Sequence, residues 1–72
     1  MVDAGLHKER GQIKCYYVLR DYGFITRLKG KDLFFMRSAF EHEEQIVEGA
    51  IVEFDIVLTP KGPKAESIRR IG

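Results

Sequence analysis

Short runs of β-branched and aromatic residues, separated by turn residues, fill the chain from Gly11 onward. Such runs are typical of β-strands. They predict five strands, at residues 12–18, 22–28, 32–37, 50–58 and 64–71. The acidic segment 38–48 lacks this alternation, and one helical turn is expected at its start, around residues 38–40. Five short strands joined by turns favour a small all-β barrel or sandwich.

The second and third predicted strands are unusual because both of their faces are apolar or aromatic. Successive side chains of a strand point to opposite faces. One face therefore carries Ile25, Leu33 and Phe35, and the other carries Tyr22, Phe24, Asp32, Phe34 and Met36. A chain of 72 residues is too short to cover both faces, so an aromatic face is expected in solvent, where it would mark a binding surface. The competing interpretation is that these aromatic residues belong to the core.

The fourth predicted strand has the ordinary pattern of a half-buried strand. Its apolar face carries Val52, Phe54, Ile56 and Leu58, and its polar face carries Glu53 and Asp55. This contrast argues that the aromatic second and third strands do not merely reflect general hydrophobicity.

The net charge of +1 conceals an uneven distribution of charge. Residues 41–55 contain six acids and no Lys or Arg, so the rest of the chain carries twelve bases against five acids, a formal charge of +7. The bases fall within residues 8–20, 27–37 and 61–70. If these segments share a face, they would attract a polyanion. The alternative is that they are solvated surface charges without a partner.

Length and composition narrow the class of protein. The length and composition of the chain predict a flexible tail at residues 1–10 and one small folded domain at residues 11–72. No apolar run is long enough to span a membrane, and no secretory signal is apparent. The single cysteine, Cys15, excludes an internal disulfide and fits a reducing, cytoplasmic location.

Nothing in the sequence points to catalysis. We find no recognisable pattern of nucleophile and base, no zinc-ligand spacing around Cys15, His7 and His42, and no glycine loop for phosphates. We therefore expect neither an enzyme nor a bound metal or cofactor.

Aromatic residues interleaved with Lys and Arg are suited to binding single-stranded nucleic acid. Each unpaired base that stacks on an aromatic ring contributes about 1–3 kcal/mol, and Lys and Arg neutralise the phosphates. The residues that supply this mixture are Lys14, Tyr16, Arg20, Tyr22, Phe24, Phe34, Arg37 and Lys61.

Several segments, in order and at nearly the right spacing, resemble the cold-shock domain. Residues 11–17 (GQIKCYY) resemble its first strand, Gly-x-Val-Lys-Trp-Phe-Asn, and residues 20–25 (RDYGFI) resemble its Lys-Gly-Phe-Gly-Phe-Ile motif. Residues 32–40 (DLFFMRSAF) resemble Asp-Val-Phe-Val-His-Phe-Ser-Ala-Ile, while 48–54 and 61–65 resemble the start of its fourth strand and its Gly-Pro-x-Ala turn. The resemblance implies a five-stranded antiparallel OB-fold barrel that binds single-stranded RNA or DNA, with RNA-chaperone or transcription and translation regulatory roles.

The resemblance also implies a set of contact residues. Lys14, Tyr16, Arg20, Tyr22, Phe24, Asp32 and Phe34 fall on ligand-contact positions of the family. Asp32 would accept a hydrogen bond from a base edge, and Arg20 and Lys61 would face phosphates.

The chain departs from the family at several of these positions. Cys15 replaces Trp, Tyr17 replaces Asn, Asp21 replaces Gly, Met36 replaces His and Arg37 replaces Phe. Tyr17 is a candidate to replace the missing Trp, and Arg37 a candidate to stack or to contact a phosphate. Simple alternation puts Tyr17 on the same face as Ile13 and Cys15, opposite Lys14 and Tyr16, whereas the resemblance requires the Cys15 position on the binding face. The phase of this strand stays open.

These departures predict binding that is weaker than, or differently selective from, that of typical members. The expected partner is single-stranded RNA or DNA, and the expected state is a monomer, with a dimer as the alternative. A rival hypothesis is a protein-interaction or dimerising barrel that has lost nucleic-acid binding. The lost stacking groups and the acidic stretch 41–55 favour this rival.

Overall fold

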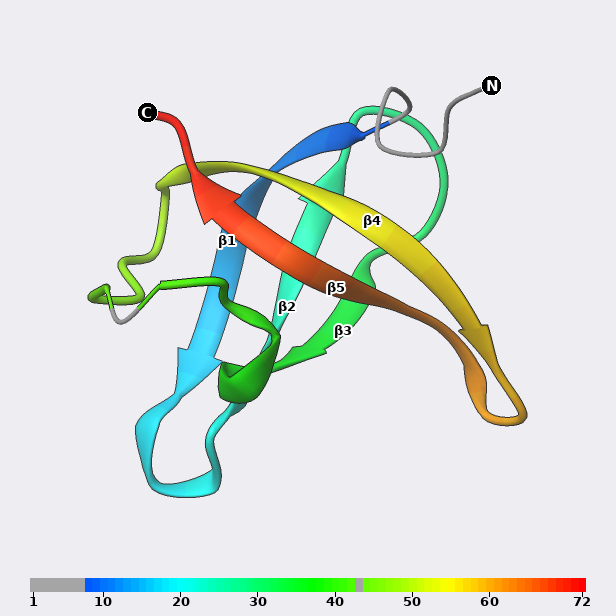
Figure 1. The fold of residues 1–72 in the computed structure, drawn as a ribbon, viewed down its shortest axis with the longest axis horizontal. Helices are drawn as coiled ribbons and strands as arrows, with labels where there is room; N and C mark the ends of the chain where they lie inside the picture. The colour runs from blue at the N-terminus through cyan, green and yellow to red at the C-terminus, as the bar shows by residue number, and fades with distance from the viewer. Residues whose placement is uncertain (1–7, 43) are drawn as a thin grey trace.

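The computed structural model describes residues 8–42 and 44–72, which form a closed five-stranded barrel with strand order β1-β2-β3-β5-β4 (Figure 1). The elements are β1 (Glu9–Tyr17), η2 (Val18–Arg20), β2 (Tyr22–Arg27), β3 (Leu33–Met36), η3 (Arg37–Ala39), β4 (Ile51–Thr59) and β5 (Gly62–Arg70). The two η elements are single turns of 3₁₀-helix. The prediction of a five-stranded barrel is confirmed, as is the helical turn after the third strand.

Strand direction alternates around the barrel except at one pair. β1, β2 and β3 pair antiparallel in order, β4 pairs antiparallel with β1 and with β5, and β3 and β5 run parallel where Phe34 is opposite Lys64. The resemblance implied an antiparallel five-stranded barrel, and four of the five strand pairs are antiparallel. A closed ring with an odd number of strands cannot alternate direction at every pair, so one parallel pair is unavoidable.

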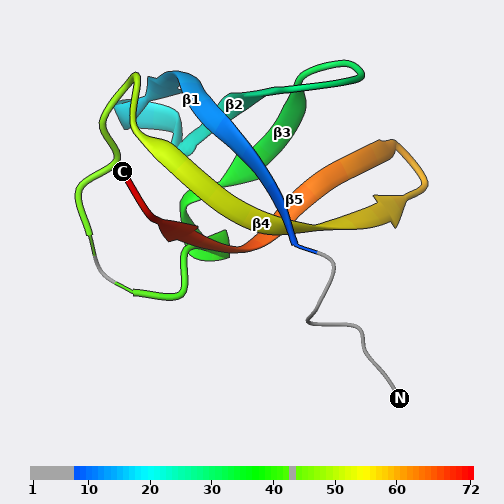
Figure 2. The same cartoon turned by 90° about the horizontal axis from the view of Figure 1, so that it is seen from above.

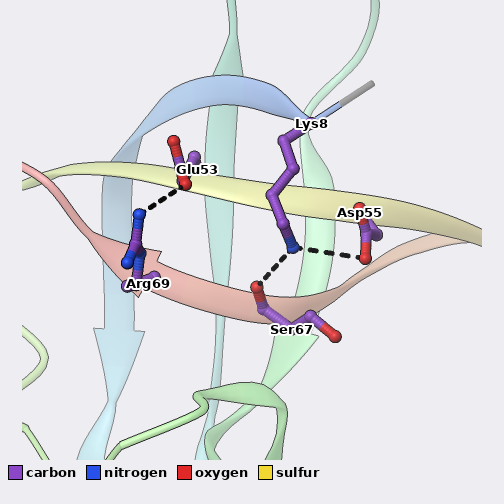
Figure 3. A network of polar contacts seen from close by, with 5 residues as sticks. All are labelled: Lys8, Glu53, Asp55, Ser67 and Arg69. Atoms are coloured by element: carbon purple, nitrogen blue, oxygen red, sulfur yellow. Dashed lines mark hydrogen bonds and ion pairs between the residues drawn. The ribbon is translucent and has the colours of Figure 1, made fainter. Parts of the chain in front are cut away.

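The start of the barrel lies earlier than the sequence predicted. Residues 1–10 were expected to form a tail, but β1 begins at Glu9. Lys8 holds this end in place: its Nζ lies 3.3 Å from Asp55 Oδ2 and donates to the carbonyl oxygen of Ser67 at 3.4 Å (Figure 3). Ser67 has a φ of 52° and lies where the pairing of β4 with β5 shifts register. The remainder of the predicted tail, residues 1–7, lies outside the described residues.

A bulge in β1 settles the phase of that strand. Ile13 is opposite Ile25, but Cys15 is opposite Phe24, so Lys14 is one extra residue. An extra residue reverses the alternation that follows it. Tyr16 therefore packs against the core, as Ile13 does, while Cys15 and Tyr17 face outward. Simple alternation fails at Lys14.

Among residues 8–42 and 44–72, ten buried apolar residues form the core: Ile13, Ile25, Leu33, Phe35, Ala39, Ala50, Val52, Phe54, Ala65 and Ile68. The inner face predicted for the second and third strands is thus confirmed. The prediction for the fourth strand holds for Val52 and Phe54 but is wrong for Leu58, which is 82% exposed. Leu58 lies near the tip of the β4–β5 hairpin, which extends beyond the other strands (Figure 2).

Gly23 permits close packing beneath the outer face of β2. It lies opposite both Tyr16 and Phe35, and a Cβ built on it would stand 2.2 Å from the Cys15 carbonyl oxygen. Because no side chain intervenes, the rings of Tyr16 and Phe35 stack with centroids 6.0 Å apart and planes 11° from parallel. This packing supports the strand that carries the outer aromatic residues.

Candidate nucleic-acid interface

Four aromatic rings form a continuous group on the outer face of β1, β2 and β3, which we call the aromatic cluster: Tyr17, Tyr22, Phe24 and Phe34. The ring centroids of Tyr17 and Tyr22 are 5.2 Å apart, and those of Tyr22 and Phe34 are 5.4 Å apart. Phe24 lies 6.2 Å from Tyr22 and 6.0 Å from Phe34 in edge-to-face geometry. These separations are those of favourable aromatic pairs.

The strand register explains why these side chains meet. Residues directly opposite one another on paired strands share a face. One row across the sheet contains Cys15, Phe24 and Phe34, and the next contains Tyr17, Tyr22 and Met36. The two rows are separated on β2 by Gly23, whose position points into the core.

Solvent reaches this cluster. Tyr17 is 47% exposed and Met36 is 46% exposed, while Tyr22, Phe24 and Phe34 are half-buried. The sequence predicted an aromatic face in solvent, and this prediction is confirmed. The rings support one another at their edges and leave part of their surface free, which is the arrangement that a stacking platform requires.

Tyr17 leans toward Cys15 across the face. The Cys15 Sγ lies 3.7 Å from the Tyr17 hydroxyl oxygen, within hydrogen-bonding range for sulfur. This hydrogen bond is the main reason that the pKa of the Tyr17 hydroxyl rises above its usual value of 10.0. The phenol is therefore neutral at physiological pH.

An ion pair borders the cluster where β1 bulges. The Lys14 Nζ lies 2.7 Å from Asp32 Oδ2. The hydrogen bond to Asp32 and the charge of that carboxylate raise the pKa of Lys14 above 10.5. One carboxylate oxygen of Asp32 thus already accepts a hydrogen bond, so a base edge that contacts this oxygen has to share it with Lys14 or displace Lys14.

A groove of about 640 Å³ lies beside the cluster, between Phe34 and the β4–β5 hairpin. Its lining is Phe34, Thr59, Pro60, Lys61, Gly62, Pro63 and Lys64. The Thr59 hydroxyl donates to the Gly62 carbonyl oxygen at 2.6 Å and accepts from the Lys61 amide at 3.2 Å, which fixes the turn. Lys61 is a predicted contact residue, and the parallel pairing of β3 with β5 also brings Lys64 opposite Phe34.

The two predicted arginines lie in the turns that follow β1 and β3. Arg20 ends η2 and is exposed, and Arg37 begins η3, where its Nη2 donates to the Glu44 carbonyl oxygen at 3.4 Å. The Arg37 amide donates to the Asp21 carbonyl oxygen at 2.9 Å, which ties the two turns together. Both arginines thus come close to the row of Tyr17, Tyr22 and Met36.

Tyr16 is the one predicted contact that lies on the inner side of the sheet. Its ring stacks on Phe35, and its hydroxyl donates to Asp21 Oδ1 at 3.1 Å. The bulge at Lys14 causes this inward orientation. The other predicted contacts lie in the cluster or along its borders.

Neither a metal centre nor a membrane-spanning helix is found in the part of the chain that the structure describes. No three His, Cys, Asp or Glu side chains among residues 8–42 and 44–72 are grouped so as to hold a metal ion. Within the same residues, no helix has the length and hydrophobicity needed to cross a bilayer.

The sequence matches one protein family and several relatives of similar length. The family of the 'Cold-shock' DNA-binding domain matches residues 9–71. A cold shock-like protein of Thermotoga maritima is 40% identical over 62 residues, covering 83% of this chain and 94% of the relative. The Retron Se72 cold shock-like protein of Salmonella heidelberg is 36% identical over 66 residues, covering 88% and 98%. A cold shock-like protein of Aquifex aeolicus is 38% identical over 66 residues, covering 88% and 94%.

Proposed function

Because this chain belongs to the 'cold-shock' DNA-binding domain family, we propose that it binds single-stranded DNA or RNA on the aromatic cluster. The observation that carries this proposal is the contact of four partly exposed rings across three neighbouring strands. Unpaired bases expose flat faces that stack on such rings, whereas paired bases in a duplex do not. The protein acts in this account by binding, without catalysis.

Positive side chains at the borders of the cluster are suited to the phosphates of the strand. Lys61 and Lys64 line the hairpin groove, and Lys14 lies at the bulge. Lys64 is paired with Glu66 at 2.9 Å and Lys14 with Asp32 at 2.7 Å, so, within the described part of the chain, Lys61 carries the unpaired charge among these three. Arg20 and Arg37 flank the opposite side. A nucleic-acid strand that crosses the cluster therefore meets Lys and Arg side chains on both sides of its path. The affinity of the protein for this nucleic acid falls as the salt concentration rises.

We further propose that binding is weaker than in typical family members. Cys15, Met36 and Arg37 stand where the resemblance implies Trp, His and Phe. Losing two stacking rings makes the free energy of binding less favourable by roughly 2–6 kcal/mol, before other residues compensate. The hydroxyl of Tyr17 contacts Cys15, so the ring of Tyr17 lies beside the position that lacks Trp. We therefore expect Tyr17 to replace part of the stacking surface that the Cys15 position lacks.

A preference for unpaired bases suits an RNA-chaperone role, because a protein that captures single strands shifts the equilibrium away from base-paired forms. The test is a competition between single-stranded and duplex oligonucleotides of the same length and sequence. A labelled oligothymidine is bound to the protein, and unlabelled single strand or duplex is added. The proposal predicts displacement by the single strand at concentrations at least ten times lower than by the duplex. Equal displacement by both would contradict it.

A second candidate function is a protein-interaction or dimerising barrel, and one observation favours it. Val18 and Leu19 follow Tyr17 directly and are both largely exposed, with Leu19 99% exposed. They extend the apolar surface beyond the aromatic cluster, and large exposed apolar patches often mark protein contacts. Light scattering over a range of protein concentrations separates the two: a dimer that dissociates when Leu19→Ser is introduced, and that excludes oligothymidine, would favour this second function.

A further inference from the structure

A second groove lies on the outer surface, around the first half of β1. It has a volume of about 320 Å³, and we call it the β1–β2 groove. Its lining is Arg10, Gly11, Gln12, Thr26, Arg27, Leu28 and Ile51. None of these residues belongs to the aromatic cluster or to the hairpin groove, and none is among the contact residues named from the sequence or in the proposed function.

The exposed surface of this groove is mostly apolar and open to solvent, although Arg10, Gln12, Thr26 and Arg27 also line it. Gln12 is opposite Thr26 on β2 and opposite Ile51 on β4, so these three residues form one row across the outer face. Leu28, at the next outward position beyond Thr26, is 90% exposed, and Ile51 is also exposed. Covering a side chain as large as leucine removes apolar surface from water, which stabilises the complex with the ligand.

The β1–β2 groove continues the aromatic cluster along the sheet. Thr26 lies two residues from Phe24 on β2 and points to the same face, which puts the two side chains about 7 Å apart. On β1, the bulged residue Lys14 lies between Gln12 of the groove and Cys15 of the cluster. A strand lying along β2 would therefore pass from the cluster into the groove without leaving the surface.

The charge at this end of the sheet suits the same polyanion. Arg10 is exposed and has no ion-pair partner among the described residues 8–42 and 44–72. Lys29 and Lys31, in the turn after β2, are exposed as well. Arg27 is paired with Glu9 at 3.3 Å and adds little net charge. The free positive charge near the groove thus comes from Arg10 and the turn.

We propose that the β1–β2 groove is a second subsite for the same single strand, and that it takes nucleotides beyond those that stack on the aromatic cluster. Leu28 and Ile51 contact a base, and Arg10 contacts a phosphate. This inference rests on the proposed function, because it assumes that a strand already lies on the cluster. It adds a longer binding site that continues along β2.

Oligothymidines of two lengths test this subsite. Binding sites on this type of barrel span about 4–16 nucleotides, so a six-nucleotide strand serves as the short probe and a twelve-nucleotide strand as the long one. Dissociation constants for both are measured for the wild type, for Arg10→Gln and for Leu28→Ser. Leu58→Ser is the matched control, since Leu58 is also highly exposed but lines neither groove. Thermal melts confirm that each variant folds.

The quantity to compare is the ratio of the two dissociation constants, because every variant offers each probe the same number of binding registers. We expect Arg10→Gln and Leu28→Ser each to reduce the advantage of the long strand by roughly 3- to 10-fold. Their affinity for the short strand should change less than twofold, and Leu58→Ser should leave the ratio unchanged.

The other outcomes separate this inference from the proposed function. If the short strand binds but the ratio is the same in all four proteins, the groove is not a subsite, and the proposed function stands. If neither strand binds the wild type, both fail together. If Leu28→Ser alters the oligomeric state and not the ratio, the groove is a protein contact and the subsite is wrong.

Discussion

The Tyr16 hydroxyl donates a hydrogen bond to Asp21 Oδ1 at 3.1 Å, which links the inner side of β1 to the turn before β2. Asp21 has a φ of 58°, in the left-handed region. Its amide donates to the Tyr17 carbonyl oxygen, and its carbonyl oxygen accepts from Arg37. This aspartate therefore holds together the two turns that flank one row of the candidate interface.

Substitutions at Asp21 separate the backbone conformation from the side-chain bond. A left-handed conformation costs a non-glycine residue about 1–2 kcal/mol, so Asp21→Ala should lower the free energy of unfolding by about that much more than Asp21→Gly. Tyr16→Phe should cost about 0.5–1.5 kcal/mol in the wild type, and close to nothing when combined with Asp21→Gly. Urea unfolding of the four variants measures both effects. Additive costs of Tyr16→Phe and Asp21→Gly would show that the hydrogen bond contributes nothing.

The phenylalanines of the aromatic cluster should carry much of the binding energy. Phe24→Ala and Phe34→Ala should each weaken oligothymidine binding by about 1–3 kcal/mol, which is roughly 5- to 150-fold. Both rings are half-buried, so melts must first show that the variants are folded at the temperature of the titration. Tyr16→Phe is a control within the same sheet and should leave affinity nearly unchanged. Equal losses for Tyr16→Phe and Phe24→Ala would contradict this assignment of the two faces.

Cys15 and Tyr17 should act as one unit in binding. Cys15→Trp places a large ring in the row of Phe24 and Phe34, and we expect it to tighten oligothymidine binding. Tyr17→Ala should weaken binding in the wild type but much less in the Cys15→Trp background, because the new ring takes over the surface that Tyr17 covers. Anisotropy titrations of the four proteins in this cycle measure the coupling. No gain from Cys15→Trp would mean that this position does not contact the strand.

The ion pair between Lys14 and Asp32 predicts a specific dependence on pH. While Asp32 is ionised, the contribution of Lys14 to folding stability is fully present below pH 10.5, and it is lost as the pH rises through the higher pKa of Lys14 in the folded protein. An NMR titration of the Lys14 side chain should give a pKa above 10.5 that returns toward 10.5 in Asp32→Asn. A wild-type pKa at or below 10.5 would show that the ion pair does not persist in solution.

Much of the candidate interface could be predicted from the sequence, because alternation along β2 and β3 is regular. The outward positions of Tyr22, Phe24 and Phe34 follow from that period alone. In β1, by contrast, alternation alone fails, because the bulge at Lys14 is a property of how two strands pair. Only the resemblance, which requires the Cys15 position on the binding face, indicated that the alternation is broken. Tyr16 is among the contacts that the resemblance implies, although its ring packs inward on Phe35.

Long-range pairing and the limits of the barrel were also beyond sequence reasoning. Lys64 comes beside Phe34 only because β5 closes the barrel against β3. Leu58 fits the apolar period of β4 but lies where the hairpin has already left the core. Periodicity reports which face a residue is on, and it does not report whether anything covers that face.

The central claim is that the nucleobases of a single strand stack on the aromatic cluster while Lys and Arg side chains bind its phosphates. One titration tests this claim most directly. Labelled oligothymidine and oligouridine are titrated with the wild-type protein, and fluorescence anisotropy is followed at a low and a high salt concentration. The account predicts dissociation constants in the micromolar range or tighter, with affinity that falls as salt rises. An absence of binding even at low salt would contradict it and would direct attention to protein partners.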